Sequence, residues 1–289
     1  MDLILINKNG QTLDLLKNKN RFILKAAEAL HGVDTEIIEN ELPYTDGSTI
    51  DDVKALPRGI ELTFKLVGNI KASIDYLTNV VKSKQWVTLR EVENGRDIVI
   101  KGIATIPPYS RMQRSCELVL SIYCPQPYWE DIDYIVGVIS EKINLLYFPT
   151  AGQYFTVEGR PFGTIDTTLE KTFNNTGDTT TGMLISIIAL GEVINPRISC
   201  STGEQNGFYM KLNITLKDDD EVQINTVKNN KYITINGLET YNGEPILNYL
   251  EWYGTDWLQL ETGPNTFSVT TEGDNSNLYF NIIYKARYE

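Results

Sequence analysis

The sequence predicts a mainly β protein with two domains and one packed helix. A chain of 289 residues exceeds the usual size of a single hydrophobic core, which favours two domains. Tyr is frequent, with 16 residues, and the abundant Thr, Asn and Ile favour strands and turns over helices. Residues 58–67 alternate between apolar and polar side chains, as a half-buried strand does. In the second half, short apolar runs and turn signals follow each other in a regular series.

The first half predicts a β-barrel-like domain over residues 1–130. Two hairpins are expected around Asn9-Gly10 and Asn94-Gly95, because Asn-Gly is a strong signal for a tight turn. Helical spacing of apolar residues predicts the helix over residues 70–85. The other expected features are an irregular stretch over 25–53 containing a loop at 43–48, and strands over 58–67 and 115–124.

Residues 131–148 predict a linker helix between the two domains. Five apolar residues have helical spacing there: Ile132, Ile135, Val136, Ile139 and Ile143. Pro149 and Gly152 would end this helix.

The second domain is expected over residues 149–289 as a β-sandwich. Its predicted features are strands over 183–190, from Arg197, over 222–225, over 257–258 and over 278–284, and a hairpin through 228–230. The acidic run Asp218–Glu221 is interpreted as a solvated turn between strands.

Charge and cysteine content limit the possible partners and the compartment. The net charge is −12, with 38 acidic and 26 basic residues, which argues against a protein that grips nucleic acid. The excess negative charge either serves solubility alone or gives the protein a surface along which DNA can pass without binding. Cys116 and Cys124 lie too far apart on one expected strand to pair, so buried thiols and folding in a reducing cytosol are expected. Neither a signal peptide at residues 1–6 nor a membrane span is expected.

Catalytic chemistry is not predicted. The chain has one histidine, His31, without an evident nucleophile or carboxylate beside it. No phosphate-binding glycine loop follows a strand, and no Cys/His spacing suggests zinc. The acidic run on a turn is not the pair of separated carboxylates that a glycosidase needs, and it lacks further ligands for calcium. We therefore expect no enzyme activity, no cofactor and no metal.

Aromatic residues give one candidate site. Trp252, Tyr253 and Trp257 lie close together in the sequence, and aromatic rings stack on sugars. Packing in the core or along a strand is the alternative interpretation. Trp252 and Trp257 are the candidate carbohydrate contacts.

The order of short motifs in the second half resembles that of the phage distal tail proteins. The motifs are Asn175-Thr176-Gly177-Asp178, Asn195-Pro196-Arg197-Ile198, the segment from Trp257 to Asn265, and Ile283 to Tyr288. The first half is also similar to the N-terminal domain of that family. It carries Asp46-Gly47, Arg58-Gly59-Ile60-Glu61-Leu62 and Cys124-Pro125-Gln126-Pro127-Tyr128 in the family's order.

The resemblance implies a structural protein of the virion tail tip, assembled in the bacterial host cytoplasm. Its N-terminal domains would form a homo-hexameric ring, and its galectin-like C-terminal sandwiches would project outward. The implied partners are the tail tube protein, the tape measure protein, a tail-associated fibre or lysin and receptor-binding proteins, with DNA passing through unbound. The alternative is a carbohydrate-binding β-sandwich module on a cell-surface or tail protein. A glycoside hydrolase is a third and less favoured alternative.

Overall fold

The computed structural model describes residues 1–41, 46–106, 117–138, 142–144, 163–165, 170–252, 256–273 and 275–289. The chain divides into two compact units. Unit 1 comprises Met1–Ile132 together with Arg287–Glu289, and unit 2 comprises Asp133–Ala286. The mainly β class predicted from the sequence is confirmed, and one α-helix occurs among the described residues.

Unit 1 is built on a nine-stranded antiparallel sheet. Seven strands follow the order β2-β1-β7-β8-β9-β6-β3, and β10 pairs with both β8 and β26. Its elements are β1 (Asp2–Asn7), β2 (Thr12–Asp14), β3 (Phe22–Glu28), β6 (Arg58–Leu66), α1 (Ile70–Val80), β7 (Gln85–Glu93), β8 (Arg96–Thr105), β9 (Glu117–Cys124), β10 (Trp129–Asp131) and β26 (Arg287–Tyr288). The hairpins predicted around Asn9-Gly10 and Asn94-Gly95 are β1–β2 and β7–β8. Asn94 and Gly95 both have positive φ, as this turn chemistry requires.

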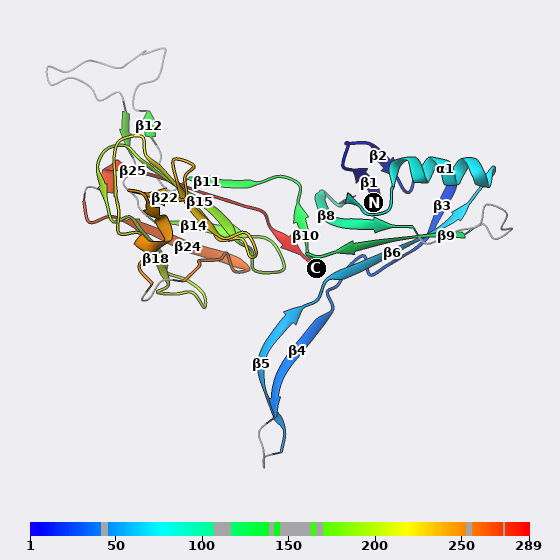
Figure 1. Ribbon diagram of the computed structural model, residues 1–289, viewed down its shortest axis with the longest axis horizontal. Coiled ribbons are helices and arrows are strands. Elements are labelled where there is room, and N and C mark those ends of the chain that lie inside the picture. Colours follow the sequence, from blue (N-terminus) through cyan, green and yellow to red (C-terminus); the bar gives the residue numbers. More distant parts are fainter. Residues whose placement is uncertain are drawn as a thin grey trace, which may run out of the picture. The chain divides into compact units, whose positions relative to one another are not determined.

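The helix α1 is shorter than the periodicity predicts. Asn69 caps its first turn by accepting a hydrogen bond from the Ala72 amide at 3.2 Å. The helix ends at Val80, because Val81 adopts an extended conformation and is buried. Lys84 has a positive φ just before β7 begins. Ile74 and Leu77 of α1 are buried, and α1 contacts β6 of the unit 1 sheet. Figure 1 shows the helix alongside this sheet.

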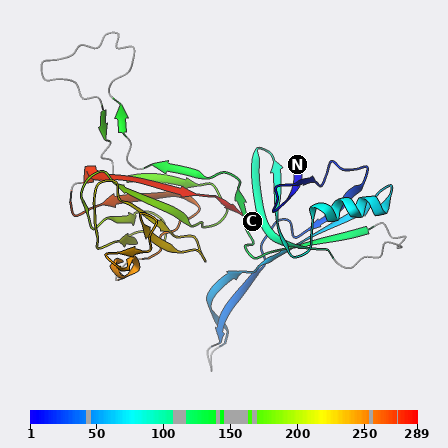
Figure 2. The ribbon, with the colours of Figure 1, turned by 45° about the horizontal axis from the view of Figure 1, so that its top comes forward.

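A two-stranded arm leaves this sheet, where an irregular stretch was predicted. The arm consists of β4 (Thr35–Glu41) and β5 (Ser48–Ala55), which pair with each other and form a separate sheet. Figures 1 and 2 show it as a ribbon projecting beyond the neighbouring strands of unit 1. Its described side chains are exposed on both faces, apart from the half-buried Ala55. The prediction of irregular structure was wrong, because a ribbon without a buried face shows no alternating pattern.

The predicted linker helix is also wrong for the described residues. Residues 129–131 form β10, and β11 (Ile135–Val138) is an edge strand of unit 2 that pairs with β25. Ile135 and Val136 are β-branched and suit a strand, and this long-range pairing overrides their helical spacing. Most of the rest of the segment, except residues 142–144, lies outside the described residues.

Unit 2 is a β-sandwich of two antiparallel sheets. The five-stranded sheet has the order β11-β25-β15-β20-β21 and the four-stranded sheet the order β14-β24-β17-β18. Their other members are β14 (Glu170–Asn175), β15 (Met183–Ala189), β17 (Arg197–Cys200), β18 (Tyr209–Lys211), β20 (Glu221–Asn225), β21 (Tyr232–Ile235), β24 (Gly263–Thr270) and β25 (Leu278–Tyr284). The minor elements are β12 (Lys142–Asn144), β13 (Gly163–Ile165), β16 (Val193–Ile194), β19 (Thr215–Leu216), β22 (Thr240–Tyr241), β23 (Glu244–Pro245), η1 (Ile246–Tyr249) and η2 (Asn275–Asn277).

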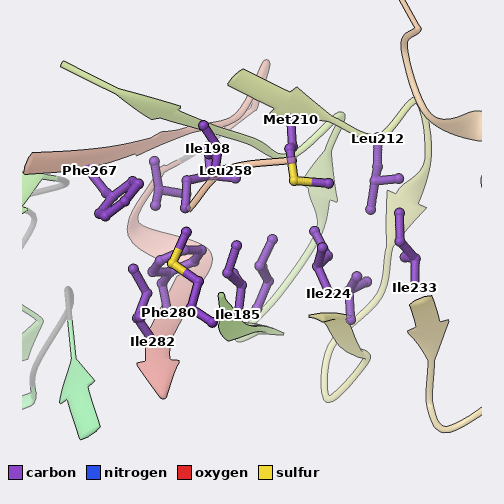
Figure 3. Close-up of a cluster of buried hydrophobic side chains, with 14 of the residues drawn as sticks. Ile185, Ile198, Met210, Leu212, Ile224, Ile233, Leu258, Phe267, Phe280 and Ile282 are labelled. Carbon is purple, nitrogen blue, oxygen red and sulfur yellow. The ribbon is translucent and has the colours of Figure 1, made fainter. Parts of the chain in front are cut away.

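The inner faces of both sheets supply the core of unit 2. Figure 3 shows Ile185 and Phe280 from the five-stranded sheet opposite Ile198 and Phe267 from the four-stranded sheet, all buried. The predicted hairpin through residues 228–230 joins β20 and β21. Residues 257–258 do not form the predicted strand, although Leu260 makes an isolated bridge to Thr181.

Two of the three cysteines are described, and both are buried free thiols. Burial raises the pKa of Cys124 to about 11, which keeps the thiol protonated and unreactive. Cys116 lies outside the described residues.

Candidate functional site

The arm presents an apolar stripe on one of its faces. Ile37 lies opposite Val53, and Glu39 lies opposite Ile50, with a β-bulge between Ile38 and Glu39. Because side chains alternate along β4, Ile37 and Glu39 point to one face and Ile38 to the other. The stripe of Ile37, Ile50 and Val53 is solvent-exposed, with Ile50 reaching 65% exposure.

The arm is acidic as well as apolar. Glu36, Glu39, Asp51 and Asp52 are exposed on its two strands, against a single Lys54. No ion pair joins these groups to other described residues. A hairpin that exposes both apolar and charged side chains, and buries almost nothing itself, is typical of an interaction element.

The sheet of unit 1 presents a second exposed apolar feature on its outer face. Trp86 on β7 lies opposite Ile103 on β8, and Ile103 lies opposite Tyr123 on β9. Gly59 on β6 continues this row beyond Tyr123, and a Cβ there would meet nothing within 4 Å. Trp86 is 53% exposed and Tyr123 54%. We call this feature the aromatic row.

The structure does not bring the two candidate carbohydrate contacts together. Trp252 is 66% exposed after η1. Trp257 is half-buried against the core of unit 2, and the Lys231 ammonium lies 5.1 Å from its ring centre. Tyr253 lies outside the described residues. Trp252 is therefore the more accessible of the two for stacking on a ligand.

Beside Trp252, Glu251 belongs to a charged cluster on the outer face of the four-stranded sheet. The Tyr209 hydroxyl donates to Glu251 at 2.7 Å, and this hydrogen bond is the main reason that the pKa of Glu251 is lowered. Lys211 lies 3.3 Å from Glu251 and 2.9 Å from Glu272, and the hydrogen bond to Glu272 is the largest factor raising the pKa of Lys211. The Arg197 guanidinium stacks 4.0 Å from the centre of the Tyr209 ring. These partners neutralise one another across the strands, which indicates a structural network.

His31 has a carboxylate neighbour that sequence analysis did not identify. Its Nε2 lies 3.3 Å from Glu91 Oε2, and its ring stacks on Trp129 with centres 6.0 Å apart. Glu91 is buried, and that oxygen has no hydrogen-bond partner among the described residues. Trp129 donates to the Leu30 carbonyl at 2.9 Å, and Arg58 donates to the same oxygen at 2.7 Å. These contacts fix the turn that leads into the arm.

The acidic run forms the predicted turn. Asp219 has a positive φ. The Lys217 amide donates to Asp220, and so does the side-chain amide of Asn236, and both bonds lower the pKa of this carboxyl. In the described part of the chain, no group of three or more His, Cys, Asp or Glu residues is placed to hold a metal. No helix among those residues is long and apolar enough to cross a membrane.

The short motifs in the second half also have structural roles. Asn175 donates to the Thr179 and Leu260 carbonyls and accepts from the Gly177 amide. Asn195 adopts a positive φ in its turn. Asn265 accepts from the Glu261 amide at 2.9 Å. These asparagines use their side chains to replace backbone partners in turns.

Comparison with known proteins finds a family model that matches most of unit 2. Residues 176–288 match the family model described as the siphovirus-type tail component, C-terminal domain. The resemblance to phage distal tail proteins seen in the sequence is thereby confirmed. No curated protein sequence matches the chain significantly.

A solved structure of a phage protein shares the fold. The chain is similar to the Dit protein (gp 19.1) of phage SPP1, described as a paradigm of the hub adsorption apparatus in Gram-positive infecting phages. The match covers 99% of both chains, with 14% sequence identity and a TM-score of 0.60. Two structures of the activated phage p2 baseplate, with Sr and with Ca, match at 12% and 11% identity and TM-scores of 0.46 and 0.44. They cover 98% and 99% of this chain and 97% of each matched chain.

Proposed function

We propose that the protein is a distal tail protein that forms a homo-hexameric ring at the phage tail tip. The match of residues 176–288 to the siphovirus-type tail component carries this proposal. The likeness of the whole chain to SPP1 Dit supports it at the level of the fold. In this function the protein is a scaffold and not a catalyst.

The exposed arm of unit 1 supports assembly into a ring. Ile37, Ile50 and Val53 remain in water in the single chain, and apolar surface of this kind is stabilised when another chain covers it. An interface between two different surfaces of the same chain is heterologous, and it closes into a ring when the rotation between copies permits.

The ring would join the tail tube and tape measure proteins to a tail-associated fibre or lysin and to receptor-binding proteins. Unit 2 would contact the host-recognition side. DNA would pass through the ring without specific binding, in keeping with the net charge of −12, because a basic channel would retain phosphates. The buried thiols Cys124 and Cys200 fit assembly in the reducing host cytoplasm.

Electron microscopy of intact tails tests this function directly. A map of the tail tip should contain six copies of this chain in a ring at the end of the tube. Labelling with an antibody against unit 2 should decorate the same position. A map that places the chain outside any ring would contradict the proposal.

One observation favours a second candidate function, a carbohydrate-binding module. Trp252 is 66% exposed, and an exposed indole is a common platform for sugar rings. If this function holds, purified protein should bind host cell-wall glycans as a monomer, and Trp252→Ala should abolish binding. Trp257→Phe provides the comparison, because Trp257 is half-buried. If glycan arrays show no binding, the carbohydrate-binding function is ruled out and the scaffold function is the remaining candidate.

A further inference from the structure

We propose that the arm of one copy docks on the aromatic row of the next copy, so that these two surfaces of unit 1 form the ring contact. This inference rests on the proposed ring and names the surface that receives the arm. The occupant of the aromatic row is a second copy of this chain, bound through the face of the arm that carries Ile37, Ile50 and Val53.

The two apolar surfaces match in extent. The aromatic row crosses four neighbouring strands, from Trp86 through Ile103 and Tyr123 to Gly59. Three spacings of about 4.8 Å give it a length of about 14 Å. On the arm, Ile50 and Val53 are three residues apart on β5, which corresponds to about 10 Å. The stripe therefore fits within the row.

The shape of the row suits a flat ribbon. Gly59 has no side chain, and the space above it is open. A ribbon that reaches this end of the row meets no side chain at position 59 itself. Beside Gly59 lies Tyr123, and Trp86 lies at the far end of the row. Their rings offer broad apolar faces, and aromatic residues of this kind dominate interface energetics.

Charge orients the arm on the row. Lys101 points to the same face as Ile103, is exposed and forms no ion pair with another described residue. Glu39 lies on the stripe face of the arm, opposite Ile50. Glu61 shares the outer face at the Gly59 end of the row, where it would repel the acidic arm. An orientation that pairs Glu39 with Lys101 brings opposite charges together and keeps the acidic arm away from Glu61.

The geometry also explains why the contact lies between copies. The arm projects away from the sheet of its own chain (Figures 1 and 2), and both its stripe and the aromatic row stay exposed within one chain. Each copy thus offers one donor surface and one acceptor surface. A contact of this kind is heterologous, so every copy can bind two neighbours.

Complementation between two full-length variants tests the inference. The arm variant combines Ile37→Ser with Ile50→Ser, and the row variant combines Trp86→Ser with Tyr123→Ser. All four side chains are exposed, so both variants should fold, which circular dichroism and native mass spectrometry can check. Matched controls are Ile38→Ser on the other face of the arm and Leu238→Ser on an exposed site of unit 2.

Each variant alone should need a roughly ten-fold or greater increase in concentration to assemble, while both controls should assemble like the wild type. A 1:1 mixture of the two variants should give dimers and nothing larger, because one intact donor meets one intact acceptor. In addition, Glu39→Lys should weaken assembly and Lys101→Glu should restore it in the same chain.

The outcomes separate this inference from the proposed ring. If the wild type assembles and the row variant assembles equally well, the aromatic row is not the acceptor, and the ring remains. If the row variant assembles but the arm variant does not, the arm docks on a surface other than the aromatic row, and this inference is wrong. If the wild type stays monomeric at every concentration and no ring appears in tail maps, both proposals are wrong.

Discussion

Substitution of Tyr288 by Ala should selectively destabilise unit 1, although Tyr288 lies at the far end of the chain. Tyr288 is buried in β26, which pairs with β10 so that Tyr288 lies opposite Trp129. The Arg96 guanidinium lies 5.1 Å from the centre of its ring, and its hydroxyl donates to Asp131 at 3.3 Å.

The magnitude follows from the area that Tyr288 buries. An aromatic side chain buries about 200 Å², which at about 25 cal/mol per Å² gives an upper limit of about 5 kcal/mol. Because β26 lies at the end of the sheet and can relax, we expect a loss of about 3 kcal/mol in the free energy of unfolding of unit 1. Tyr288→Phe retains the ring and loses only the hydroxyl contact, so its loss should stay below about 1 kcal/mol.

Hydrogen exchange measured by mass spectrometry is the suitable assay, because a protein with two units need not unfold in one step. A loss of about 3 kcal/mol corresponds to roughly 100-fold faster exchange of the amides that open only on global unfolding of unit 1. Peptides from β7 and β8 should show this acceleration, and peptides from β15 and β20 in unit 2 should not. Unchanged exchange in β8, or equal acceleration in both units, would refute the reasoning.

Three further outcomes are expected. A fragment of residues 133–286 should unfold cooperatively in urea, because it contains the whole core of unit 2; gradual unfolding would contradict this. Gly182→Ala should reduce the free energy of unfolding by about 1–3 kcal/mol and so lower the melting temperature, because the new Cβ would lie 2.4 Å from the Val227 backbone. Gly59→Ala is the control and should be nearly neutral, because its Cβ would meet nothing within 4 Å. Backbone and side-chain amides lower the pKa of Asp220 below its ordinary 3.8, so Asp220 contributes stability above that value and loses it as the pH falls through the lowered pKa. The stability difference between wild type and Asp220→Asn in urea titrations should therefore shrink below about pH 4, and a difference that is constant with pH would contradict this.

Sequence reasoning succeeded where local chemistry and burial agree. Asn94-Gly95 favours a tight turn by its own conformational preferences, and each flanking strand buries one face. The β7–β8 hairpin could therefore be predicted from these residues alone. The same holds for Leu278–Tyr284, which alternates strictly between buried and half-buried side chains.

The errors arose where long-range pairing or exposure decides the structure. Ile135 and Val136 have helical spacing, but β25, more than 140 residues later in the chain, pairs with them as a strand. The arm has no buried face, so its sequence shows no period. The aromatic row depends on the register of β7, β8 and β9, because Trp86 and Tyr123 meet Ile103 only across strands. The pairing register of these three strands cannot be predicted from any local sequence pattern.

The antiparallel pairing of β10 with β26 has a consequence for how the protein can be re-engineered. Glu130 lies opposite Arg287, so the next positions along the two strands, Asp131 and Ala286, are where a tight hairpin turn would close. Unit 2 therefore occupies the place of a hairpin loop, as an inserted cassette of residues 133–286. Such loop positions tolerate exchange of whole domains. A two-residue Asn-Gly turn in place of unit 2 would give a continuous unit 1 on its own, and other domains could be grafted at the same junction without altering the arm or the aromatic row.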